Sequence, residues 1–476
     1  MGLQVGETHS PGVLKKIVQA GVRNKSYAEA SRELSESAEL SIGPKAVERA
    51  VRRIGSERVA QRDAATEAFR ELPLPEQRDG CPQPKAPSVA VVQFDCGRML
   101  VRERDRVSPP DTVPSPAARG EEDRAHAEED AHGAERIAEV ALSAAAQCSA
   151  EVEADQVAGE ATADAAEEAQ VDECRSRFWR DSKVGCLLSM HSVAHAEDPC
   201  PEIPASFLEI GRVTELVRQL GSHASGVPRA PAEQGVEQER EKEQESGDAR
   251  RPGAPVPLVR TILASRMCSA VFGAMLVAAA WARGFAAATR KAFVADGAAM
   301  NWTLWARYFS HYVPILDFIH ALQYVFAAAM AGRSFATGWD VYRRWIQWVW
   351  EGRVAEVIAA LRQRQEELGL APKDAPATDP RTVVAVTLGY LQTHQSRMDY
   401  ARYRRLGLPI MSCYAESAVK QINHRVKGTE KFWGEVGAEA ILQLRADYLS
   451  ETQPLTRFWQ QRQQTATGQR CYRCAA

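Results

Sequence analysis

The chain has 476 residues, of which 45% are hydrophobic and 25% are charged, and its net charge is −3. This length predicts two to four domains of roughly 100–200 residues each, and the composition is that of an ordinary globular chain able to bury a sizeable core. The charge balance excludes a basic field over the whole chain, and the longest apolar run, near 270–280, is shorter than the roughly 20 residues that cross a bilayer, so no membrane partner is expected.

The range 11–70 is predicted to be helical, because its apolar residues recur at helical spacing. Ser26 and Glu29 are spaced as a capping box, and a Pro-led helix follows that we expect to end near Gly55. Such a pair resembles a helix-turn-helix, whose second helix enters the DNA major groove, while a plain helical hairpin with a solvated basic face fits equally well. The candidate DNA contacts on this helix are Lys45, Arg49, Arg52 and Arg53.

A Pro-rich range, 71–87, is predicted to be a linker. The β-branched run after it ends in Asp95, continues as Cys-Gly-Arg and is followed by a second apolar run at 99–101. This pattern predicts a β-hairpin with Asp95 at the end of its first strand. A turn-forming aspartate without any further role is the simpler interpretation of that acid.

Two ranges lack the apolar residues needed for a core. The range 119–173 holds 17 Asp and Glu against three Arg and no Lys, and the range 225–256 is rich in Gly, Pro, Gln and Glu. We expect both to be disordered or loop insertions. Between them, 183–190 has the character of a strand.

The remainder alternates short strands with helices. A helix is predicted at about 265–283, then a strand ending in Asp296, then a shorter strand ending in Asp317. The range 318–400 reads as helical and Trp-rich, with its tryptophans expected mostly in a core. One or two helices are predicted over 412–450, and Glu416 lies at or just before the first.

Ten cysteines are scattered without a disulfide-like rhythm. The one Cys-x-x-Cys pair, Cys471 and Cys474, supplies only two of the four ligands of a structural zinc site. The first residues lack the basic and then apolar pattern of a signal peptide. We therefore expect reduced thiols in a cytoplasmic protein.

Three acids are candidates for metal chemistry: Asp95, Asp296 and Glu416. Acids that end neighbouring strands converge at one edge of a sheet, and Mg²⁺ and Mn²⁺ prefer oxygen ligands. Two such ions can activate an attacking oxygen and stabilise a leaving one in phosphodiester chemistry. Taken singly, each acid has a simpler interpretation, because Asp-Gly is a common turn and a helical Glu usually faces solvent.

Four stretches together resemble bacterial insertion-sequence transposases of the Mutator-like group. They are VVQFDCGRM (91–99), RKAFVADGAAMNW (290–302), PILDFIHAL (314–322) and the range 407–433. The resemblance covers most of residues 11–470. The chain departs from the family pattern at Cys96, where a Gly is common, and in its two long polar insertions.

The resemblance implies an α/β fold with an RNase H-like mixed sheet. The catalytic core would span 88–317 and 401–470, with an all-helical insertion at 318–400 and a helical DNA-binding unit at 11–70. The three acids would be catalytic and would hold two Mg²⁺ or Mn²⁺ ions. Asp317 competes for the second acid position, but it also fits the Asp-x-x-His signature of this group, completed by His320, so Asp296 is preferred.

His320 is predicted to orient a nucleophile or to contact DNA, its alternative being a core histidine. Basic residues near the third acid suit a phosphate backbone, and a solvated helix face would look the same. The candidates there are Lys420, Arg425 and Lys427.

The function implied by the resemblance is metal-dependent cleavage at the ends of a mobile element, followed by strand transfer. The partners would be terminal-repeat DNA, target DNA and further copies of the chain, at the bacterial nucleoid. Two other hypotheses stay open from the residues: a catalytically decayed relic that only binds DNA, and an unrelated metal-dependent nuclease that cuts without joining.

Overall fold

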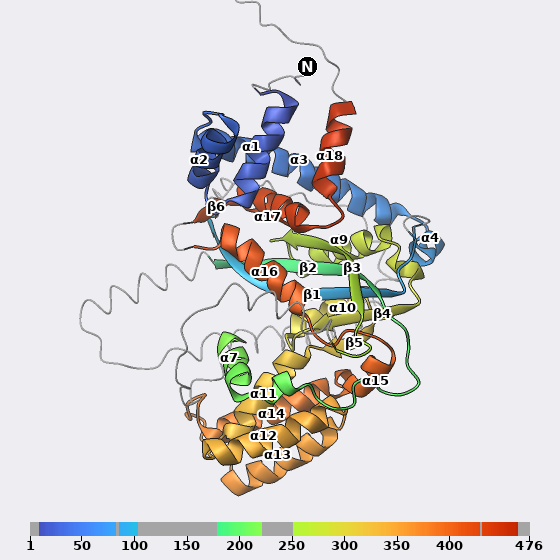
Figure 1. The fold of residues 1–476 in the computed structure, drawn as a ribbon, viewed down its shortest axis with the longest axis vertical. Coiled ribbons are helices and arrows are strands. Elements are labelled where there is room, and N and C mark those ends of the chain that lie inside the picture. The colour runs from blue at the N-terminus through green and yellow to red at the C-terminus, as the bar shows by residue number, and fades with distance from the viewer. Residues whose placement is uncertain (1–8, 82–84, 103–178, 221–250, 429–430, 465–476) are drawn as a thin grey trace, which may run out of the picture. The chain divides into compact units, whose positions relative to one another are not determined.

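The computed structural model describes residues 9–81, 85–102, 179–220, 251–428 and 431–464 (Figure 1). Contacts divide the chain into two units, 1–101 with 180–476 and 102–179. Of the second unit only the two end residues are described. The predictions for 119–173, for most of 225–256, and for Cys471 and Cys474 lie outside the described residues.

A mixed β-sheet is the centre of the first unit, and its strands follow the order β3-β2-β1-β4-β5. β2 and β3 are antiparallel, whereas β1, β4 and β5 run parallel to one another. A short strand, β6, pairs with β1 outside this order. The strands are β1 (Val89–Arg102), β2 (Trp179–His191), β3 (Val256–Ser265), β4 (Arg290–Ala295), β5 (Val313–Leu316) and β6 (Phe432–Gly434). The α/β class with a mixed sheet is thereby confirmed.

β1 corrects the predicted hairpin. The chain does not turn at Cys96 and Gly97 but continues as one strand of 14 residues, so Asp95 lies in the middle of a strand. The reason is packing: a Cβ on Gly97 would lie 2.7 Å from Oδ1 of Asn423 in α16 (Cys413–Val426). The glycine therefore serves a close helix-to-strand approach and not a turn.

The two faces of β1 meet different helices, because successive side chains of a strand point to opposite sides. Phe94 lies on one face, with its ring centroid 5.5 Å from that of Phe272 in α9 (Ser269–Ala282). Gln93, Asp95 and Gly97 share the other face, which the chain before and within α16 covers. Asp95 consequently faces the helix that carries Glu416.

The helices near the N-terminus are α1 (Pro11–Arg23), α2 (Tyr27–Ala38) and α3 (Pro44–Glu71), which confirms the predicted helical range. The prediction that this helix ends near Gly55 is wrong, because α3 continues to Glu71. A Cβ on Gly55 would lie 2.5 Å from that of Ala440 in α17 (Glu435–Leu449), so the glycine is where the two helices cross. A short helix, α4 (Leu74–Asp79), lies within the predicted linker.

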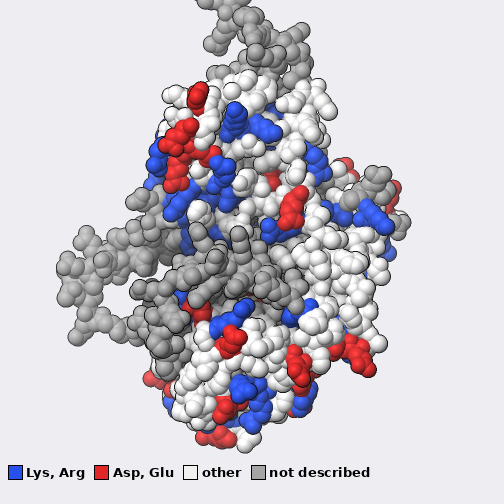
Figure 2. Space-filling model, viewed as in Figure 1, with Lys and Arg blue, Asp and Glu red and all other residues white. Residues whose placement is uncertain are grey.

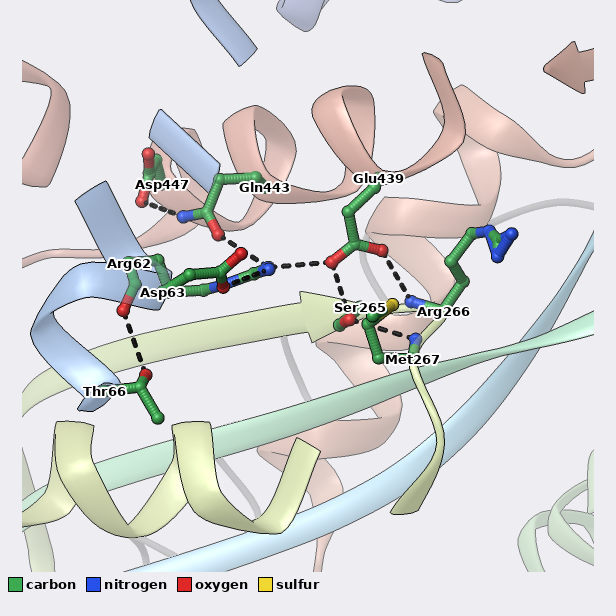
Figure 3. A network of polar contacts seen from close by, with 9 residues as sticks. All are labelled: Arg62, Asp63, Thr66, Ser265, Arg266, Met267, Glu439, Gln443 and Asp447. Carbon is green, nitrogen blue, oxygen red and sulfur yellow. Dashed lines mark hydrogen bonds and ion pairs between the residues drawn. The ribbon is translucent and has the colours of Figure 1, made fainter. Parts of the chain in front are cut away.

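A buried polar network joins α3, α17 and the end of β3 (Figure 3). Glu439 of α17 accepts hydrogen bonds from Nη1 of Arg62 at 2.8 Å, from Oγ of Ser265 at 2.6 Å and from the backbone N–H of Arg266 at 3.0 Å. Both charged partners are largely buried, with about a tenth of each side chain exposed. The N-terminal helices are thus bonded to the sheet's edge strand through α17.

The range 318–400 contains four helices, grouped at the lower end of Figure 1: α11 (Phe318–Met330), α12 (Phe335–Trp350), α13 (Val354–Leu368) and α14 (Pro380–His394). Side-chain oxygens cap three of them, from Asp317, Ser334 and Asp379. Trp339, Trp345 and Trp350 are buried, as predicted for core residues. The other described helices are α7 (Ile210–Leu220), α10 (Ala299–Tyr308), α15 (Tyr400–Arg405) and α18 (Pro454–Gln464), with single 3₁₀ turns at Ala205–Phe207, Phe285–Ala287 and Gln395–Arg397.

Candidate metal centre

Three aspartates lie side by side at one rung of the parallel strands. Phe94 of β1 is paired with Ala295 of β4, and Ala295 with Leu316 of β5. The next residue along the chain is in each case an acid: Asp95 within β1, Asp296 just after β4 and Asp317 just after β5. Because neighbouring strands lie about 4.8 Å apart, this register brings the three carboxylates together where β4 and β5 end beside the middle of β1.

Glu416 is brought to the same place by a buried glutamine of β1. Nε2 of Gln93 donates to the carbonyl of Met411 at 2.9 Å, and Oε1 of Gln93 accepts from the backbone N–H of Ala415 at 3.1 Å. These bonds fix the turn before α16 against the middle of β1. Glu416, in the first turn of α16, therefore lies over the strand that carries Asp95.

Asp317 is fully buried and uses both of its oxygens within the protein. Oδ1 accepts from the backbone N–H groups of Ile319 at 2.7 Å and His320 at 3.1 Å, which caps α11. Oδ2 accepts from the backbone N–H and, at 2.6 Å, from the hydroxyl of Ser412. Asp317 thus ties the start of α11 to the turn before α16, a structural task that Asp296 does not have.

His320 lies one helical turn after Asp317, and its Nδ1 is 3.4 Å from Oδ1 of that acid. One potential ligand atom each from Asp317, His320 and Glu416 lie within 4.8 Å of one another. Among the residues that the structure describes, this is the group whose side chains are close enough to share one cation. Glu416 belongs both to this group and to the predicted set of three acids.

The concentration of acids perturbs their protonation. Burial and the negative charge of Asp296 raise the pKa of Asp95 to about 6, and burial and Asp317 raise the pKa of Glu416 to about 7. Burial alone would lower the pKa of His320, but the carboxylate of Asp317 and the other nearby acids raise it to about 10. Buried carboxylates that repel one another fit a divalent cation, since a cation favours their ionised forms.

Asp296 follows the end of β4 and is held by the start of α10. Its Oδ1 accepts from the backbone N–H of Ala298 at 2.9 Å and from the side-chain amide of Asn301. Gly297, the next residue, is covered by the ring of Tyr390 from α14, because a Cβ there would lie 2.3 Å from that ring. Asp296 is therefore flanked by α14, and 119 residues separate it from Glu416 along the chain.

The predicted DNA-contacting residues fall into two groups. Lys45, Arg49, Arg52 and Arg53 are all exposed on α3, opposite its buried Val47, Val51 and Ile54. Figure 2 shows blue and red atoms intermingled where Figure 1 labels α1 and α2, so the visible surface of these two neighbouring helices carries both signs of charge.

The second group requires a correction at Arg425. Lys420 and Lys427 are exposed on and just after α16, but Arg425 is 2% exposed. Its Nε donates to the carbonyl of Gly21 at 3.1 Å, and its guanidinium lies 4.5 Å from the ring centroid of Tyr27. The cation therefore attaches α1 and α2 to α16 and is not available to a DNA backbone.

Four residues that contact the acids or the chain beside them were not predicted: Gln93, Asn301, Tyr390 and Ser412. Gln93 gave a signal, since a lone amide within the apolar run 89–94 must find partners when buried. Tyr390 and Ser412 gave none, because their contacts join segments far apart along the chain.

No protein-family model matches the chain, and no curated protein matches it significantly. None of the helices that the structure describes combines the length and the apolar character needed to cross a bilayer.

Proposed function

We propose that this chain is a DNA transposase of the DDE type with an RNase H-like core, and that Asp95, Asp296 and Glu416 are its catalytic acids. One observation carries the proposal: parallel strands place Asp95 and Asp296 on one rung, and Gln93 brings the Glu416 helix over the first of them. The mixed sheet followed by a helical insertion also agrees with the arrangement that the sequence resemblance implies.

The donor set suits hard divalent cations. Three carboxylates offer the oxygen ligands that Mg²⁺ and Mn²⁺ prefer, and the nitrogen of His320 beside Glu416 would be better tolerated by Mn²⁺. When bound, two such ions supply an activated water and charge stabilisation at the phosphorus. Asp317 is assigned a supporting role, because its oxygens already accept four hydrogen bonds.

The reaction consists of two displacements at phosphorus. In the first, a water oxygen forms a bond to phosphorus while the bond to the 3′-oxygen of the neighbouring nucleotide breaks, leaving a free 3′-hydroxyl at the end of the element. In the second, that hydroxyl attacks a phosphodiester of the target, and the target's own 3′-oxygen leaves. No covalent link to the protein is needed, so no Ser or Tyr nucleophile is assigned.

Exposed cations near the acids would guide the DNA. Lys420 lies one turn after Glu416 on α16, and its charge acts on that carboxylate. Lys427 lies at the end of the same helix, and the exposed basic residues of α3 would hold a second DNA segment. Each phosphate contact adds affinity that falls with salt concentration.

The test is strand cleavage of a DNA fragment containing the flanks of the gene, with Mn²⁺ or Mg²⁺. Wild type is compared with Asp296→Ala and with Asp340→Ala, which removes an exposed acid of α12. We expect cleavage at the repeat boundary by wild type and Asp340→Ala, and its loss in Asp296→Ala. Cleavage without joining would favour the nuclease, and DNA binding without cleavage the decayed relic.

A further inference from the structure

Tyr390 presents a buried hydroxyl without a partner beside the candidate metal centre. Its oxygen is shielded from solvent and makes no hydrogen bond with any described residue. Buried hydroxyls are nearly always bonded, because leaving one unsatisfied is costly. A donor of this kind is available to a partner that arrives with a ligand or with a second state of the site.

The surroundings fix where the hydroxyl lies. The ring of Tyr390 is stacked on that of Tyr324 of α11, with centroids 3.7 Å apart and planes at 14°. Its edge meets His394, with centroids 4.7 Å apart, and His394 makes a hydrogen bond with the backbone of Gly297. The ring is thus held from two sides and has little freedom to turn its hydroxyl elsewhere.

The hydroxyl lies next to the residue that follows Asp296. A Cβ built on Gly297 would be 2.8 Å from the phenol oxygen. Burial and the negative charges of Asp296 and Asp317 raise the pKa of Tyr390 well above its ordinary value, so the phenol keeps its proton at neutral pH. A protonated phenol beside carboxylates is a hydrogen-bond donor without an acceptor.

Resting on the proposed function, we infer that Tyr390 is a positioning residue that donates a hydrogen bond to the carboxylate of Asp296 when that acid binds a divalent cation. In the structure Oδ1 of Asp296 is held by Ala298 and Asn301. Carboxylates that ligate metals are usually held by hydrogen bonds from outer residues, and losing such a bond typically lowers metal affinity 10–100-fold. The helical insertion thereby takes part in the metal centre through α14.

The test compares Mn²⁺ binding and thermal stability in Tyr390→Phe and Tyr342→Phe. The second is a matched control, because the hydroxyl of Tyr342 is also buried in the insertion but donates to the carbonyl of Phe207 at 2.9 Å. We expect Tyr390→Phe to weaken Mn²⁺ binding roughly 10–100-fold, with an unchanged or raised melting temperature without metal. Tyr342→Phe should lower the melting temperature and keep the wild-type affinity.

Each other outcome has a definite meaning. Unchanged Mn²⁺ affinity in Tyr390→Phe, or a metal-free melting temperature lowered as much as in Tyr342→Phe, overturns the inference and leaves the proposed function standing. If wild type binds Mn²⁺ but does not cleave DNA, the catalytic proposal fails, while the affinity of Tyr390→Phe still decides the role of Tyr390. If wild type binds no Mn²⁺, both fail.

Discussion

Replacing Asp95 by Asn should stabilise the metal-free protein at alkaline pH. Asn keeps the shape and can still accept the hydrogen bond that Oδ1 of Asp95 takes from the N–H of Cys96 at 2.6 Å. It removes a negative charge that is half-buried and faces Asp296. The substitution therefore removes an electrostatic cost without removing a packing contact.

The magnitude follows from the pKa. Burial and Asp296 raise the pKa of Asp95 from 3.8 to about 6, and such a rise corresponds to about 3 kcal/mol between the two protonation states. Since the pKa is higher in the folded state, the stability contributed by this group is complete below pH 3.8 and is lost as pH rises through about 6. The advantage of Asn should be about 3 kcal/mol at pH 8 and small near pH 4.

The assay is urea unfolding at pH 8 and pH 4 with a chelator present. Asp340→Asn, at an exposed position of α12, is the control and should change the free energy of unfolding by less than about 0.5 kcal/mol. A destabilised Asp95→Asn protein at pH 8, or a gain of equal size at both pH values, would show that repulsion between Asp95 and Asp296 does not limit stability. With saturating Mn²⁺ at pH 8, wild type should have a higher free energy of unfolding than Asp95→Asn, because only wild type keeps all three acids that bind the metal.

Two further predictions concern the framework of the site. Glu439→Ala should lower the free energy of unfolding by about 1–3 kcal/mol in urea titrations, since it removes the acceptor of buried donors on Ser265 and Arg266 and one of the acceptors of Arg62. Glu435→Ala, at an exposed ion pair, should change it by less than about 1 kcal/mol. Gly97→Ala should reduce DNA cleavage and stability together, because its Cβ would meet Asn423 at 2.7 Å and push α16 away. Gly437→Ala, in open helix surface, should instead stabilise by roughly 0.5–1 kcal/mol, and a harmless Gly97→Ala would contradict the packing argument.

Much of the sheet could be predicted from sequence, because strands that end in an acid are local patterns. The β4 strand before Asp296 and the β5 strand before Asp317 were expected from apolar runs of four to six residues. The helical character of the range 318–400 could likewise be predicted from a local pattern of apolar residues. These features depend on neighbours in the chain, which the sequence displays directly.

The errors have a common physical origin in contacts between distant segments. The sequence predicts a turn at Gly97 and a helix end near Gly55. In the structure, each glycine is instead a position where another helix approaches too closely for a Cβ. The sequence predicts Arg425 as an exposed cation, and only the fold reveals that it donates a hydrogen bond to the carbonyl of Gly21. The two hydrogen bonds that Ser412 donates to Asp317 likewise join residues that are 95 positions apart in the chain.

A crystal structure with Mn²⁺, with anomalous scattering recorded at the manganese absorption edge, would locate the metal directly. We expect strong peaks among the three acids, with carboxylate oxygens of Asp95, Asp296 and Glu416 about 2.0–2.3 Å from the metal. A peak held only by Asp317, His320 and Glu416 would contradict the assignment of the three acids. No peak at a saturating Mn²⁺ concentration would contradict a metal centre among these acids altogether.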